Sequence, residues 1–127
     1  MKILLLFSLL SVPAFAQKAI EPIRVSLIER QADCAEFSRA FREELRHFPD
    51  VAVVTRRVDF EVHIAAARLL DDDGVVFGYA ATLLVVRGKD KYHSIYVGRS
   101  EALLAHRVVA ELNARFLEPK RGYKAGK

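Results

Sequence analysis

The stretch that decides the fold is VDFEVHIAAARLLDDDGVVFGYAATLLVVRGKDKYHSIYV, residues 58–97. It contains three segments rich in β-branched and aromatic residues, separated by residues 71–74 and 88–91. In the first segment, bulky apolar residues occupy every second position, and this period is typical of a strand with one buried face. The aspartates and glycines between the segments favour tight turns. These residues therefore predict a three-stranded antiparallel meander.

The two predicted turns distribute the side chains of the meander over two faces. The bulkier set is assigned to the core: Phe60, Val62, Ile64, Phe77, Tyr79, Leu83, Val85, Tyr92 and Tyr96. The opposite set is Glu61, His63, Ala65, Val76, Ala80, Thr82, Leu84, Val86, His93, Ile95 and Val97. Because a sheet with one solvated face normally alternates apolar and polar residues, an apolar second face indicates a partner site. We expect this interaction face to centre on His63, Leu84, Val86, Ile95 and Val97, unless a turn slips by one residue or residues 17–58 cover it.

Helices and short strands flank the meander. Residues 23–28 alternate like a strand, Asp33 is a candidate N-cap, and residues 51–54 form a short apolar run. Apolar residues at helical spacing follow Asp33 and predict an amphipathic helix that ends at Pro49. Residues 101–117 predict a closing helix that begins after Ser100 and ends before Pro119. The inward stripes are Phe37, Phe41, Leu45 and Phe48 in the first helix, and Leu104, Val108, Leu112 and Phe116 in the second. The order predicts an α+β fold, a mixed four- or five-stranded sheet with two helices packed on one face.

The N-terminus has the three parts of a secretory signal peptide. Lys2 supplies the positive charge, residues 3–10 are apolar, and Ala14 and Ala16 give the A-x-A spacing of a cleavage site. A membrane-spanning helix would need about 18 to 20 apolar residues, which this run does not reach. We therefore expect cleavage after Ala16, a single α+β domain over residues 17–119 and a basic flexible tail over residues 120–127.

Charge and cysteine content limit the partners and the compartment. The chain carries a net charge of +4, which becomes +3 once Lys2 is removed with the signal peptide. The basic residues are dispersed, so nucleic acid is not expected as a partner. The tail is a candidate for weak contact with anionic lipid or polysaccharide. Cys34 is the only cysteine, so no internal disulfide forms, and Gln17 rather than cysteine stands at the cleavage point, so no lipid anchor is expected.

Motifs for catalysis are absent from the sequence. No nucleophile elbow, H-E-x-x-H motif or glycine-rich phosphate loop is present. The predicted register aligns His63 with Thr82 and Val97, which places the backbones of His63 and His93 about 16 Å apart, too far to share a metal or a proton. The aspartates at 71–73 do not match the ligand spacing of a calcium loop. No catalytic residue, metal or cofactor is expected.

Gly98, Arg99 and Ser100 form a candidate anion site, because they precede a helix whose first N–H groups are unpaired. A turn followed by an N-cap explains the same three residues. The sequence leaves both interpretations open.

The order of elements, with Asp59 and Phe60 opening a strand and a closing helix that contains Leu104 and Val108, resembles a known family of domains. Over residues 23–117 it is similar to the small α/β domain of bacterial envelope proteins such as CsgG and the N-terminal domain of TolB. The resemblance implies a periplasmic assembly or docking module without catalysis.

Export and the apolar sheet face together predict a periplasmic or secreted protein that acts as a non-catalytic interaction or assembly module. Its partner would be an envelope protein or a second copy of the chain. The alternative is a small-ligand or glycan-binding protein, or a minor hydrolase of the periplasm.

Overall fold

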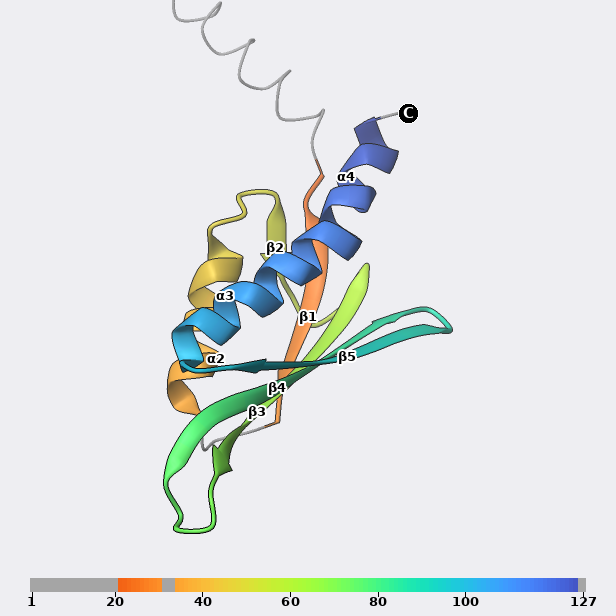
Figure 1. The fold of residues 1–127 in the computed structure, drawn as a ribbon. Helices are drawn as coiled ribbons and strands as arrows, with labels where there is room; N and C mark the ends of the chain where they lie inside the picture. Colours follow the sequence, from red (N-terminus) through yellow and green to blue (C-terminus); the bar gives the residue numbers. More distant parts are fainter. Residues whose placement is uncertain (1–20, 31–33, 126–127) are drawn as a thin grey trace, which may run out of the picture.

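Figure 1 shows the fold of the computed structural model, which describes residues 21–30 and 34–125. The elements in chain order are β1 (Ile23–Glu29), α2 (Ala35–Arg46), β2 (Val51–Val53), β3 (Phe60–Leu70), β4 (Val76–Arg87), β5 (Asp90–Gly98), α3 (Glu101–Leu112), the π-helical turn η1 (Asn113–Leu117) and α4 (Glu118–Ala125). The strands form one five-stranded sheet in the order β2-β1-β3-β4-β5. The predicted α+β fold with a mixed sheet is confirmed. The predicted signal peptide, residues 1–16, lies outside the described residues.

The first strand lies between two parallel neighbours. β1 pairs with β2 on one side and with β3 on the other, and α2 makes the crossover between β1 and β2. Parallel strands need such a long connection because both must run in the same direction. Ile23 and Val25 of β1 are buried while Arg24 is exposed, as the alternation of this segment predicts.

The helix α2 is amphipathic, and its aromatic stripe faces the core. Phe37, Phe41 and Leu45 are buried, and Arg39 on the outer face pairs with Glu36. The predicted N-cap Asp33 lies outside the described residues. Cys34 directly precedes the helix and is buried, so the thiol belongs to the core rather than to the surface.

The meander closes through the two predicted turns. In the first, Asp71 Oδ1 accepts hydrogen bonds from the N–H groups of Asp73 and Val75, both at 2.9 Å, and Gly74 adopts a φ of +80°. In the second, only Gly88 and Lys89 separate the paired residues Arg87 and Asp90. Gly88 has a φ of +61°, which glycine tolerates because it has no Cβ.

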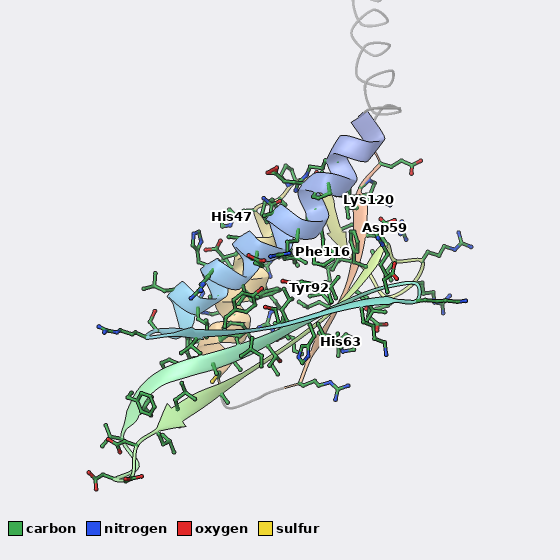
Figure 2. The ribbon with its side chains drawn as sticks, turned by 45° about the vertical axis from the view of Figure 1, so that its right-hand side comes forward. His47, Asp59, His63, Tyr92, Phe116 and Lys120 are labelled. Atoms are coloured by element: carbon green, nitrogen blue, oxygen red, sulfur yellow. The ribbon has the colours of Figure 1, made fainter. Side chains whose placement is uncertain are left out.

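The helices cover one face of the sheet (Figures 1 and 2). α2 and the continuous helix formed by α3, η1 and α4 lie on the same side, and the core fills the space between them and the strands. Sheet residues assigned to the core from sequence are buried there, including Phe60, Val62, Ile64, Leu83 and Val85. Tyr79 and Tyr92 are half-buried against this core, and Phe77 is exposed.

Phe77 was predicted to face the core, but 63% of it is exposed. Its strand pairing explains the error, because the register shifts between Leu69 and Leu70, which pair with Gly78 and Val76 and leave Phe77 as the extra residue of a bulge. A bulge inserts one residue and changes the alternation beyond it. Phe77 therefore lies at the solvent-exposed end of the β3–β4 hairpin.

The closing helix is longer than predicted, and the prediction that it ends before Pro119 is wrong. The π turn η1 precedes Pro119, and the N–H of Glu118 donates to the carbonyl of Asn113, five residues earlier. A proline within an α-helix clashes with the carbonyl four residues before it. The wider turn accommodates the ring, and the helix continues as α4.

The first residues of the predicted tail, Lys120 and Arg121, dock onto the domain. Lys120 pairs with Asp59 at 3.3 Å, and Arg121 pairs with Asp50 and stacks over the ring of Phe48 at 5.3 Å. Residues 120–125 belong to the helix α4. Among the described helices, none is long and apolar enough to span a membrane.

Candidate functional site

The candidate site is the sheet face that the helices leave uncovered, which we call the open face. Its side chains are Ser26 and Ile28 of β1, Glu61, His63, Ala65 and Ala67 of β3, Ala80, Thr82, Leu84 and Val86 of β4, and Lys91, His93, Ile95 and Val97 of β5. Figure 2 shows His63 on this side, whereas Tyr92 and Phe116 lie between the sheet and the helix. Ile95 is 66% and Val97 57% exposed, and Leu84 and Val86 are half-buried by their neighbours. The five residues predicted for the interaction face thus share one surface.

The register within this face differs from the sequence prediction. His63 lies opposite Leu84, and Leu84 lies opposite His93, so the two histidines occupy one cross-strand row. At a strand spacing of about 4.8 Å their backbones are about 10 Å apart, not the predicted 16 Å. In each hairpin the pairing is displaced by two residues from the predicted register. A displacement of two residues leaves every side chain on its predicted face. Leu84 separates the two imidazoles.

His63 is held by a neighbour on its own strand. Its Nε2 lies 2.8 Å from Glu61 Oε1, and only 17% of its side chain is exposed. Its Nδ1 is buried and has no hydrogen-bond partner among the described residues. Burial of an unpaired ring nitrogen carries a free-energy cost.

Small side chains leave a shallow hollow in the middle of the open face. One shallow cavity of about 250 Å³ is lined by Arg30, Ala65, Ala66, Ala67, Ala80 and Thr82. A second, of about 130 Å³, shares Arg30, Ala65 and Thr82 with it and extends to His63, Leu84 and His93. Sequence reasoning missed Arg30 and the hollow, although the alanines at 65, 67 and 80 signal a place where side chains do not fill the surface.

The outer edge of β5 borders the open face. Arg107 Nη1 donates to the carbonyl of Val97 at 3.2 Å, so that carbonyl points away from β4. Backbone groups of alternate residues point to the same side of a strand, so the edge groups belong to Lys91, His93, Ile95 and Val97. These are the same residues whose side chains lie on the open face. A partner on this edge would therefore contact both.

The charge at the margins of the open face is mainly positive. Arg30 follows β1 at one end and lines the hollow, and Lys91 is exposed near the start of β5. The carboxylate of Glu61 is engaged by His63. A ligand surface that carries carboxylates around an apolar centre would match this distribution.

The candidate anion site at Gly98, Arg99 and Ser100 is a helix start. Ser100 Oγ accepts a hydrogen bond from the N–H of Leu103 at 3.1 Å, which is the geometry of an N-cap. Arg99 is exposed. The cap uses the N–H of Leu103, one of the donors on which an anion site would depend.

Other sequence candidates are explained by local structure. Asp71 accepts hydrogen bonds from backbone N–H groups within its own turn. His106 Nδ1 lies 3.1 Å from Glu44, and His47 is exposed. Within the described ranges, no group of three histidine, cysteine or acidic side chains is placed to hold a metal ion.

Comparison with known proteins adds no functional assignment. No protein-family model matches the chain, and no curated protein is significantly similar to it in sequence.

Proposed function

We propose that this chain is an exported, non-catalytic interaction module of the bacterial envelope that binds a partner protein through the open face and the edge of β5. The observation that carries the proposal is the exposure of Ile95 and Val97, together with half-buried Leu84 and Val86, on a face that no described helix covers. Isolated exposed apolar residues are common on protein surfaces, but a contiguous group is typical of a binding surface.

The geometry of the face favours a protein over a small ligand. Its two hollows are shallow and of about 250 and 130 Å³, smaller than the clefts of roughly 300 to 1,000 Å³ that usually bury small molecules. The adjoining edge of β5 offers backbone donors and acceptors to an incoming strand. A flat apolar surface next to an open edge suits an extended segment of a protein.

The charge of the face specifies the chemistry of this partner. Arg30 and Lys91 lie at opposite margins of the face. The partner is therefore a different protein that presents an apolar segment flanked by carboxylates, because two copies of this basic margin would repel each other.

Export is supported by the signal-peptide pattern of residues 1–16. The resemblance to the CsgG and TolB domains supports a role in envelope assembly or docking. Both inferences rest on sequence and remain predictions, as do the periplasmic or secreted location and the absence of catalysis.

In-cell photo-crosslinking tests the proposal. A photoreactive residue is placed at Leu84 or Ile95 on the open face, and at Leu103 as a control, since Leu103 is 70% exposed on α3. We expect adducts with one acidic partner protein from the first two positions and not from Leu103. Equal labelling from all three positions, no adducts, or adducts only between copies of the chain would overturn the proposal.

A further inference from the structure

A further cavity lies on the helix side of the sheet, away from the open face. It has a volume of about 280 Å³ and is lined by Phe60, Arg87, Arg115, Phe116, Pro119 and Lys120. These residues come from the start of β3, the end of β4, the π turn and α4. The lining combines apolar rings with three cations and contains no carboxylate.

The apolar wall of this cavity is fixed in position. The ring of Phe116 packs edge-on against Phe60 and Tyr92, with centroid distances of 5.7 and 5.3 Å. Phe60 is buried in the core, and Figure 2 shows Phe116 and Tyr92 between the helix and the sheet. Such tilted ring contacts stabilise a defined arrangement. A flat apolar group entering the cavity would therefore meet a preformed surface.

The cations are positioned by carboxylates that lie outside the lining. Arg115 pairs with Glu111 and stacks over Tyr92 at 5.2 Å, and Lys120 pairs with Asp59. The hydrogen bond that Arg115 donates to Glu111 raises the pKa of the Arg115 guanidinium, so this group keeps its charge.

Arg87 is the least constrained of the three cations. Its nearest ion-pair distance is 3.8 Å, to Asp90, and 63% of its side chain is exposed. A loose and exposed pair contributes little, so Arg87 is available to a ligand at small cost.

The π turn explains why these groups converge. Asn113–Leu117 carries Arg115 and Phe116, and Pro119 lies two residues after its end. A π turn adds a residue to a helical turn and is frequent at functional sites. In this chain it turns a basic and an aromatic side chain toward the end of the β4 strand.

We infer that this cavity binds a small organic anion with a flat apolar body, such as an aromatic carboxylate. The carboxylate meets the guanidinium groups of Arg87 and Arg115, which suit its planar geometry, and the ring lies against Phe116 and Pro119. The volume of about 280 Å³ lies just below the usual range of roughly 300 to 1,000 Å³, so the ligand has one ring or two fused rings. Size does not distinguish this cavity from the hollows of the open face; its lining of aromatic rings and three cations does. This inference is independent of the proposed function, because it concerns a different surface.

Titration with 2-naphthoate tests the inference, with chemical shifts of backbone amides in two-dimensional NMR as the readout. We expect saturable shifts at Phe60, Arg87 and Phe116, and no such shifts with the neutral analogue 2-naphthalenemethanol. Arg87→Gln should weaken naphthoate binding about tenfold, the effect of losing one charge-assisted hydrogen bond. Arg39→Gln, which changes an exposed arginine on the outer face of α2, is the matched control and should bind like the original chain.

Three results would overturn the inference. They are shifts that centre on the open face, equal shifts with the neutral analogue, and unchanged affinity in a folded Arg87→Gln variant. Each of these leaves the crosslinking test of the open face unaffected, so the two proposals fail separately.

Discussion

Lys120 Nζ lies 3.3 Å from Asp59 Oδ1, so the last helix is tied to the residue that precedes β3 (Figure 2). Asp59 also accepts a hydrogen bond from the backbone N–H of Arg24 at 2.8 Å. One carboxylate thus joins β1, the β2–β3 loop and α4. Asp59 therefore stabilises the fold through more than one interaction, and the ion pair with Lys120 is only one of them.

We expect Asp59→Ala to lower the free energy of unfolding more than Lys120→Ala does. Loss of Lys120 removes an ion pair, which contributes about 1 kcal/mol at most at a partly exposed position. Loss of Asp59 also leaves the Arg24 N–H without this acceptor, at a further cost of about 1 to 3 kcal/mol. Urea denaturation of both variants measures the difference, and equal losses would contradict it.

Two glycines should respond in opposite ways to alanine. A Cβ on Gly78 would lie 3.2 Å from the carbonyl oxygen of Gly98 on β5, whereas a Cβ on Gly122 in α4 meets nothing within 4 Å. We expect Gly78→Ala to destabilise the protein by about 1 to 3 kcal/mol, because a backbone atom must move. Gly122→Ala should stabilise it by up to about 1 kcal/mol, because alanine favours the helix. Thermal unfolding distinguishes the two signs, and a stabilised Gly78→Ala variant would argue against the close approach of β4 and β5.

The bulge at Phe77 leads to a stability prediction. Phe77 is 63% exposed, whereas Leu83 on the same strand is completely buried. Phe77→Ala should change the free energy of unfolding by no more than about 0.5 kcal/mol. Leu83→Ala should cost about 2 to 5 kcal/mol, because it opens a cavity in the core. Guanidinium denaturation measures both values. A large loss of unfolding free energy in Phe77→Ala would show that this side chain packs in the core.

Tyr96 should make the stability fall at high pH. Burial raises the pKa of the Tyr96 phenol, so the folded state retains a proton that the unfolded state releases. Stability from this group is complete below the unfolded tyrosine pKa of about 10 and is lost as the pH rises through the folded value. Urea denaturation between neutral and alkaline pH should show a shallower decline for Tyr96→Phe than for the original chain.

A matched variant controls for the loss of a hydroxyl group. Tyr79→Phe, on the same face of the sheet, measures what the loss of one tyrosine hydroxyl group does to the free energy of unfolding at neutral pH. Because the hydroxyl of Tyr96 is buried with no hydrogen-bond partner among the described residues, Tyr96→Phe should not destabilise the protein at neutral pH. If the unfolding free energy of Tyr96→Phe falls at high pH as steeply as that of the original chain, groups other than Tyr96 cause the fall.

The sequence could predict the elements and the two sheet faces because both depend on local periodicity. Phe60, Val62 and Ile64 alternate and are buried, and Phe37, Phe41 and Leu45 recur at helical spacing and are buried. The open face was also predictable, since an error of two residues in a hairpin keeps each side chain on its side. For this reason Leu84 and Ile95 are on the predicted face although their strand neighbours differ from those predicted.

Only the tertiary structure decided which residues meet across elements. The row of His63, Leu84 and His93 depends on a bulge at one turn and on a two-residue loop at the other. Both features are small changes in backbone geometry that the residue pattern does not encode.

The same holds for the end of the chain. The sequence predicts that Pro119 ends the helix, because the local effect of proline is to break a helix. The π turn relieves that effect, and Arg121 then bonds to Asp50, 71 residues earlier in the chain. The sequence by itself determined the periodic elements, whose cause lies within a few residues. The docked helix, the cavity beneath it and the histidine row were decided by contacts between distant segments, whose free energy depends on the completed fold.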